Sequence, residues 1–212
     1  MRHKDEMSVF TQDHINRAAS AALAYPALMM EYEYTDLALR DPLCDRFIRR
    51  LVYNDLIPGM QLQGDPATII DRAIKALREG PEKIARLTLN GSDVMRDVFS
   101  PVSVNLLKEG RSPQYCAFMI AVWFRCMMGY THRLKPLEVE EPHQRAIYTR
   151  ISVGNHSKGG LIEDIFDFKL YMSDNFQALL EKQHRNIFEN GTREAMGILL
   201  NGPKPRLANT PG

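Results

Sequence analysis

One stretch near the middle of the chain limits the possible folds more than any other. Residues 114–129 read QYCAFMIAVWFRCMMG, and their side chains are apolar nearly all the way round a helix. The run is shorter than the ~18 residues that a membrane-spanning helix needs, so other parts of the protein must shield it from water. Ser112-Pro113 provides a start signal. The sequence therefore predicts a buried central helix in an all-α domain, with its methionines and aromatic residues in the core.

Two further helices are marked by start and stop signals. Asp41-Pro42 and Asp65-Pro66 each place an N-cap residue before a proline at the first helical position. Apolar residues follow each pair at helical spacing, and Pro58-Gly59 and Gly80-Pro81 should end the two runs. These signals predict one helix over about 42–57 and another over about 66–79.

Helices are also expected toward both ends of the chain. Thr11 or Asp13 should open a first helix in an Ala-rich stretch, with a kink or a new helix start at Pro26. Ser173 caps a later helix that Gly191 should end, and residues 192–200 form a last short helix. The expected apolar face of the later helix consists of Phe176, Leu179, Leu180, Ile187 and Phe188.

Residues 131–160 contain the clearest loop signals. The stretch holds Gly, Lys and His, and only IYTRISV (147–153) alternates briefly as a strand would. The run Glu138, Glu140, Glu141 is expected to be solvated. Because no interior linker divides the chain, we expect a single helical domain over residues 1–200, followed by a disordered Pro/Gly-rich tail at 201–212.

Composition limits the classes of binding partner and the cellular compartment that we expect. A formal net charge of +1 gives no field for gathering nucleic acid or anionic lipid, so neither partner is expected. The three cysteines, an odd number, are typical of buried reduced thiols. The opening MRHKDEMSVF lacks the apolar region of a signal peptide. These features together indicate a cytoplasmic protein.

No catalytic motif stands out from the residues alone. The six histidines are scattered, none lies in HExxH, and no Cys/His pair has zinc spacing. The segment Asn155-His-Ser-Lys-Gly-Gly lacks the spacing and the preceding buried strand of a phosphate loop. Taken by themselves, the residues indicate a soluble helical domain and give no reaction.

Several landmarks, taken in order, resemble the C-terminal, substrate-binding domain of the mannitol dehydrogenase family, the polyol-specific long-chain dehydrogenases. ALAYPALMMEYEYTDLALRDPLCDRFIRRLVYNDLIP (22–58) resembles the run from the catalytic helix into the arginine-rich Asp-Pro-Leu helix. IARLTLNGSDVM (84–95) is similar to the Arg-Ile-x-x-Asp-Gly-Ser segment. The family's Gly-Arg-x-Pro turn and Ala-x-Trp-x-Arg helix follow, here with Ala121, Trp123 and Arg125. Residues 162–190 match the closing region more loosely.

The resemblance implies positions for the catalytic residues. The family's catalytic helix carries Lys-x4-Asn-x2-His, in which the lysine is the general base. The register set by ALAY and YEY places Gln12, Arg17 and Ser20 at these positions. An amide cannot take a proton as an amine does, and a hydroxyl cannot replace an imidazole near neutral pH. No residue is therefore expected to act as the catalytic base at the family position.

The resemblance also implies substrate contacts. Arg86 stands where the family has an arginine that reaches the substrate's hydroxyl or carboxylate groups, a task that suits a bidentate guanidinium. A surface arginine is the alternative interpretation. The family's pocket lysine eight residues further on falls on Val94. Asn16 lies one residue out of register, and His14 is the only titratable neighbour, so both are candidate substrate contacts beside Arg86.

The family binds NAD or NADP mainly in an N-terminal Rossmann domain, and this sequence contains no βαβ pattern. No cofactor and no metal are expected to bind this chain alone. The leading hypothesis is the substrate-binding domain of an NAD(P)-dependent polyol or sugar-acid oxidoreductase. It would be truncated or split, and inactive alone or dependent on a partner Rossmann-domain chain. The alternatives are a non-catalytic helical binding or scaffold module derived from that family, and an unrelated helical protein.

Overall fold

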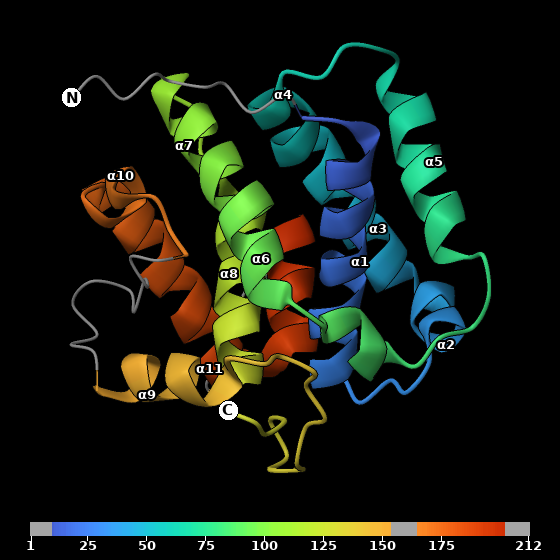
Figure 1. Cartoon of the computed structure of the whole chain (residues 1–212), viewed down its shortest axis with the longest axis vertical. Helices are drawn as coiled ribbons and strands as arrows, with labels where there is room; N and C mark the ends of the chain where they lie inside the picture. The colour runs from blue at the N-terminus through green and yellow to red at the C-terminus, as the bar shows by residue number, and fades with distance from the viewer. Residues whose placement is uncertain (1–9, 154–164, 202–212) are drawn as a thin grey trace, which may run out of the picture.

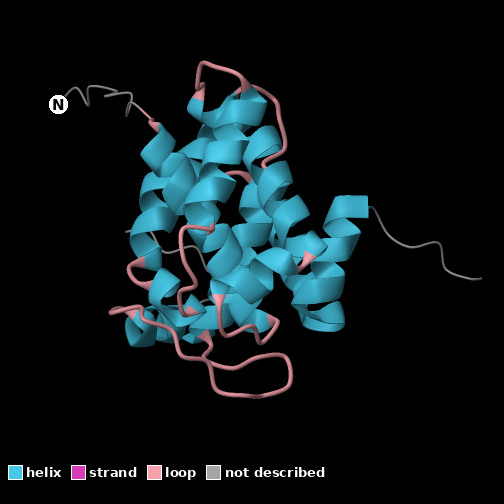
Figure 2. Cartoon of the chain, turned by 90° about the vertical axis from the view of Figure 1, so that its right-hand side faces the viewer, coloured by secondary structure: helices cyan, strands magenta, loops and turns pink. Residues whose placement is uncertain are grey.

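Helices make up most of the part of the chain that the computed structural model describes, residues 10–153 and 165–201 (Figure 1, Figure 2). The first elements are α1 (Gln12–Met29), α2 (Thr35–Arg40), α3 (Pro42–Leu51), η1 (Val52–Leu56), α4 (Ile57–Met60), α5 (Pro66–Leu77) and η2 (Ile84–Thr88). They are followed by α6 (Gly91–Val94), η3 (Met95–Phe99), α7 (Ser100–Lys108), α8 (Gln114–Met127), α9 (Gln144–Val153), α10 (Phe168–Tyr171) and α11 (Asp174–Asn201). Between residues 10 and 201, outside the gap at 154–164, β-pairing is limited to two isolated bridges. The all-α prediction is confirmed.

The predicted central helix is α8. All its residues except Gln114 and Arg125 are buried, and Phe118, Met119 and Trp123 are 0% exposed. Helices α1 and α11 both pack against it. Burying apolar surface contributes ~25 cal/mol per Å2, so this helix is the main organiser of the core.

A buried carboxylate caps the start of α8. Asp55, on the π-helical turn η1, is 1% exposed and accepts the backbone N–H groups of Tyr115 and Cys116 at 2.9 and 2.8 Å. Burial raises the pKa of Asp55 to about 6, and the two N–H donors oppose that rise. The cap satisfies amide donors that an apolar environment would otherwise leave without partners.

Helix α1 continues through Pro26 and ends one turn later at Met29. Two residues on, Glu31 adopts a left-handed conformation with φ of +66°, which reverses the chain toward α2. The helix that begins at Asp41-Pro42 likewise runs through η1 and Pro58 to Met60, three residues beyond its predicted end. A proline inside a helical run has no N–H to donate, so each run passes its proline with one intrahelical hydrogen bond missing.

Some predictions are wrong. Residues 144–153 form helix α9, although the sequence there suggested a loop with a brief strand pattern. Phe188 is 76% exposed and does not belong to the apolar face of α11, and Glu141 is buried at 6% exposure. Gly191, with φ of +76°, breaks α11 as expected, and a last helical segment follows it. The predicted tail, from residue 202 on, lies outside the described residues. None of the described helices is both long and apolar enough to cross a membrane.

Candidate functional site

A polar stripe runs along the first half of α1. Gln12, Asn16 and Ser20 are spaced four residues apart, which places them on one side of the helix. The Gln12 side-chain amide donates to Asn16 Oδ1 at 3.1 Å and to the carbonyl of Ile69 at 3.4 Å. All three side chains are half-buried. The stripe, hereafter the α1 polar face, offers amide and hydroxyl groups to a ligand.

Arg17 connects this face to the segment that follows the Asn-Gly turn. Its Nη2 donates to Asp97 Oδ2 at 3.4 Å, and both side chains are 36% exposed. Asp97 also accepts from Arg96 Nε at 2.9 Å, and Arg96 in turn donates to Asp93 at 2.7 Å. Four alternating charges therefore bridge α1 and residues 93–97. The bridge leaves most of the five N–H donors of Arg17 available.

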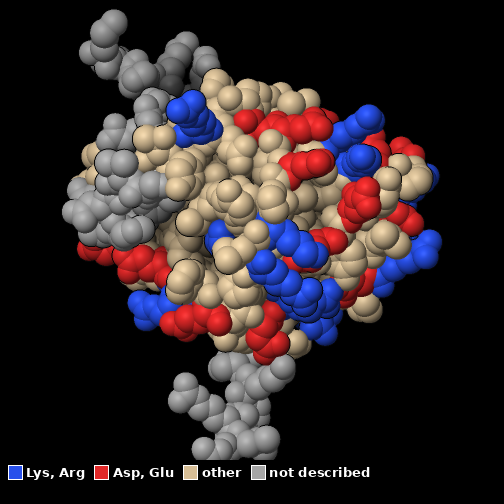
Figure 3. All heavy atoms as spheres, turned by 90° about the horizontal axis from the view of Figure 1, so that it is seen from below, with Lys and Arg blue, Asp and Glu red and all other residues tan. Residues whose placement is uncertain are grey.

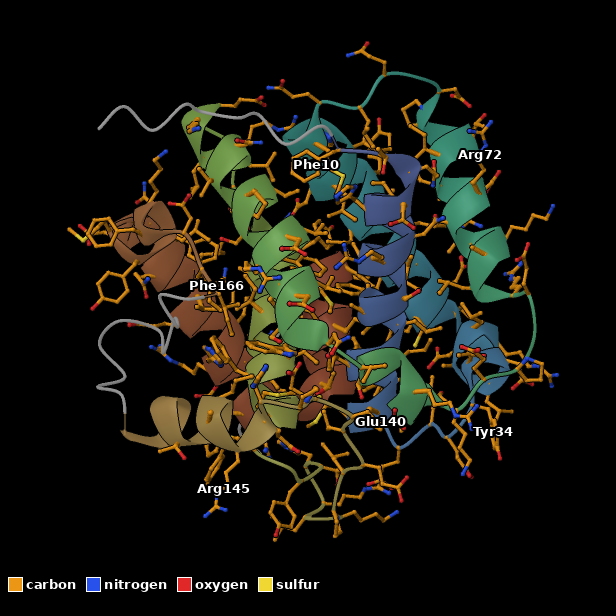
Figure 4. The ribbon with its side chains drawn as sticks, viewed as in Figure 1. Phe10, Tyr34, Arg72, Glu140, Arg145 and Phe166 are labelled. Carbon is orange, nitrogen blue, oxygen red and sulfur yellow. The ribbon has the colours of Figure 1, made fainter. Side chains whose placement is uncertain are left out.

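His14 lies on a different side of α1 from Asn16. Two residues turn a helix by about 200°, so the two side chains point in nearly opposite directions. The His14 Nδ1 atom accepts the backbone N–H of Thr11 at 3.2 Å and lies 3.0 Å from the Thr11 hydroxyl. Phe10 packs edge-on against its ring at 5.5 Å, at the start of α1 (Figure 4). The structure therefore uses His14 to begin the helix, away from Asn16.

Arg86 is an exposed residue of η2, and its side chain forms no hydrogen bond or ion pair with any other described residue. The short segments η2 and α6 pack against α1. The contact is made in the second half of α1, where the Tyr25 hydroxyl donates to the Thr88 carbonyl at 3.2 Å. Val94, at the family's lysine position, is half-buried against the core.

The Asn90-Gly91 turn is required by close packing. Asn90 is left-handed with φ of +54°, a conformation that asparagine tolerates. A Cβ atom on Gly91 would lie 1.6 Å from the Tyr25 hydroxyl and 3.1 Å from Trp123 Nε1. Only glycine fits this position, because both aromatic side chains are fully buried. Tyr25, Gly91 and Trp123 all belong to the segments that resemble the family.

A buried glutamate holds the same turn from the other side. Glu141 accepts the backbone N–H and the hydroxyl of Ser92 at 2.9 and 3.0 Å. The preceding residue, Glu140, donates its backbone N–H to Thr88 Oγ1 at 2.8 Å and lies next to η2 (Figure 4). The sequence suggested a solvated Glu141, and no local pattern distinguishes it from Glu138 or Glu140. Two of its donors belong to Ser92, 49 positions earlier in the chain.

The chemistry available at the α1 polar face is hydrogen bonding and charge. None of Gln12, Asn16, Arg17 and Ser20 can accept a proton from an alcohol near neutral pH. Burial raises the pKa of the nearby Tyr25, which keeps its phenol protonated. No group of three potential metal ligands occurs between residues 10 and 201, the undescribed 154–164 apart. The same residues contain no strand–turn–helix unit that would fit the pyrophosphate of a nicotinamide dinucleotide.

Known proteins resemble this chain over most of its length. No family model matches the sequence. Mannitol dehydrogenase DSF1 of Saccharomyces cerevisiae is 24% identical over 189 residues, which cover 85% of this chain and 37% of that protein. Mannitol 2-dehydrogenase of Aspergillus fumigatus is 21% identical over 189 residues, with the same two coverages. The chain thus spans a little over a third of the length of these relatives.

Two solved structures share the fold. A ternary complex of Pseudomonas fluorescens mannitol 2-dehydrogenase with NAD and D-mannitol superposes with a TM-score of 0.80 and 18% identity. The match covers 94% of this chain and 42% of that one. Substrate-free D-sorbitol dehydrogenase gives a TM-score of 0.72 and 17% identity over 86% of this chain and 39% of that one. By sequence and by fold, the chain is related to the mannitol dehydrogenases.

Proposed function

We propose that the α1 polar face, with Arg17 beside it, binds a polyol or a sugar acid and that this chain does not oxidise it. The observation that carries the proposal is the polar stripe on α1, in which Gln12 and Ser20 stand where the resemblance implies reacting groups. Amide and hydroxyl groups suit sugar hydroxyls, and the Arg17 guanidinium suits a carboxylate. The chain would therefore act as a substrate-binding domain like that of a polyol oxidoreductase.

The absence of turnover follows from residue chemistry. Oxidation of an alcohol needs an acceptor for the hydroxyl proton, and Gln12, Arg17 and Ser20 offer none. Loss of a general base alone typically costs ~10²–10⁴-fold in rate. NAD or NADP would be held by a Rossmann domain, adjoining or on a partner chain, since the described residues do not fit it. A cytoplasmic location remains a prediction.

Nuclear magnetic resonance titration of the protein with D-mannitol and with a hexuronate tests the binding half of the proposal. We expect the amide resonances of residues 12–20 to shift. Arg17→Ala should weaken the binding of the hexuronate more than the binding of mannitol, because only the acid carries a charge. Arg145→Ala, at an exposed position on α9, is the matched control and should leave both titrations unchanged.

Nicotinamide absorbance tests the catalytic half. With NAD or NADP and a panel of polyols, or NADH with fructose or a hexuronate, the protein should show no turnover. A rate near the ~10 s⁻¹ typical of enzymes would contradict the proposal. His14→Ala would then be the first variant to make, because His14 is the only histidine on α1.

A second candidate function is a helical binding module that has lost the sugar site. The bonds from Gln12 to Asn16 and from Arg17 to Asp97 favour it, because they already satisfy part of the polar face. A dissociation constant of ~10 mM corresponds to a binding free energy of only ~3 kcal/mol. If sugar added well above that concentration shifts no amide resonance of α1, this second function replaces the first.

A further inference from the structure

A cleft at the other end of α1 has no role in the proposed function. It lies between the α1–α2 connection, the start of η2 and the loop 131–138, and its volume is about 310 Å3. Leu28, on its wall, is eight residues beyond Ser20, which corresponds to ~12 Å along a helix axis. The cleft is therefore a separate place on the molecule, large enough for a small metabolite.

The rim of the cleft is held in a fixed shape. Glu31 forms an ion pair with Lys135 and accepts from the Thr131 hydroxyl at 3.4 Å. The same hydroxyl oxygen accepts the backbone N–H groups of Arg133 and Lys135, each at 3.2 Å. Two non-glycine residues in these loops, Glu31 and Leu134, are left-handed, with φ of +66° and +62°. Such conformations cost ~1–3 kcal/mol each and persist where the surroundings impose them, as they often do at ligand sites.

The cleft combines an apolar floor with unpaired charges of both signs. Ala85, Pro136 and Leu137 supply apolar surface, whereas Leu28 and Ile84 are almost fully buried. Glu31 and Lys135 neutralise each other, whereas Lys83, Glu33 and Glu138 are exposed and form no ion pair with any other described residue. Figure 3, which views the molecule from this end, shows acidic and basic side chains intermixed.

A ligand that satisfies all three features carries an anion, a cation and an apolar body. A polyol offers neither charge nor apolar surface, and a dianion would be repelled by Glu33 and Glu138. We propose that this cleft binds a free α-amino acid with an apolar side chain. Lys83 meets the carboxylate, Glu33 and Glu138 meet the ammonium group, and the side chain lies on the floor formed by Ala85, Pro136 and Leu137.

Titration of the full chain with L-leucine, followed by nuclear magnetic resonance, tests the site. Amides of residues 28–33, 83–85 and 131–138 should shift, with a dissociation constant in the ~1 mM range because the charges are exposed. Leucinamide lacks the carboxylate and N-acetyl-leucine lacks the cation, and each should bind on the order of fivefold more weakly. Absence of shifts in these segments overturns the proposal. So does leucinamide binding as tightly as leucine, which would indicate the N-terminus of a peptide.

Substitutions at three exposed positions test which charged side chains contact the ligand. Lys83→Gln and Glu138→Gln should each weaken the binding of L-leucine about threefold to fivefold. Lys108→Gln, at the exposed end of α7, should leave it unchanged. Circular dichroism checks that all three variants fold. If Lys108→Gln weakens binding as much as Lys83→Gln, the attraction is unspecific and the site is wrong. The result is independent of the sugar site, because sugars report on residues 12–20.

Discussion

The two halves of α1 have different surroundings. Every residue from Ala21 to Met29 is buried, whereas between Gln12 and Ser20 only Ile15, Ala18 and Ala19 are. The second half packs against the Gly91 turn, and the first half carries the α1 polar face. The ALAY segment that resembles the related dehydrogenases lies in the buried half, and the positions at which the resemblance implies catalytic groups lie in the open half. The comparison teaches that one half of a helix can keep its core packing while the other half carries different polar groups.

The largest expected effect tests the buried half. Gly91→Ala places a methyl group 1.6 Å from the Tyr25 hydroxyl, and neither partner has room to move. Overpacking of this kind costs ~1–3 kcal/mol, and more where the site is rigid. We therefore expect the free energy of unfolding, measured by urea denaturation, to fall by ~3 kcal/mol or more.

Gly197→Ala is the matched control for that substitution. Gly197 lies within α11, and an added Cβ meets no atom within 4 Å. Replacing a helical glycine by alanine there should stabilise the protein by ~0.4–1 kcal/mol. Equal destabilisation by both substitutions would mean that Gly91 is not tightly packed.

The next effect concerns the buried cap of α8. Since burial raises the pKa of Asp55 from 3.8 to about 6, the folded state holds the proton more tightly than the unfolded state does. The stability from Asp55 is therefore fully present below about pH 4 and is lost as the pH rises through 6. At ~1.36 kcal/mol per pH unit, the loss is about 3 kcal/mol.

Asp55→Asn isolates this contribution, because asparagine does not titrate and its oxygen can still accept the two N–H groups. The difference in unfolding free energy between the original protein and the variant should fall by about 3 kcal/mol from pH 4 to pH 7. A difference that does not change with pH would mean that Asp55 titrates alike in both states.

A smaller effect is expected at the Asn90–Ser92 turn, which packs against the buried half of α1. Glu141→Ala leaves the Ser92 N–H and hydroxyl without their buried acceptor, which costs ~1–3 kcal/mol. Glu140→Ala removes an exposed carboxylate and keeps the backbone bond to Thr88, so it should change stability by less than ~0.5 kcal/mol. Thermal unfolding compares the two variants. Similar losses of stability in the two variants would show that the buried Glu141 carboxylate does not stabilise the turn.

The parts of the fold that the sequence predicts are those with local causes. The apolar run of α8, the Asp-Pro starts of α3 and α5, and the break at Gly191 each follow from neighbouring residues. Burial of Glu141 and exposure of Phe188 depend on partners far along the chain, and no local pattern contains them. At the site, the placement of Gln12, Arg17 and Ser20 at the family's catalytic positions stays a prediction from the resemblance. The resemblance could not predict that Arg17 is paired with Asp97 or that His14 caps α1.

The smallest expected effect tests the open half. The Arg17–Asp97 pair is 36% exposed on both sides, and exposed pairs contribute only ~0.2–1 kcal/mol. A double-mutant cycle with Arg17→Met and Asp97→Asn should give a coupling energy in that range, and added salt should reduce it because water and ions screen the charges. A coupling energy above ~2 kcal/mol that salt does not change would mean that this face is shielded from solvent. In that case the pair would hold α1 against residues 93–97 as firmly as Tyr25 and Gly91 do, and a sugar could enter only after the pair had opened. A weak, screened pair leaves Arg17 free to exchange Asp97 for the carboxylate of a ligand.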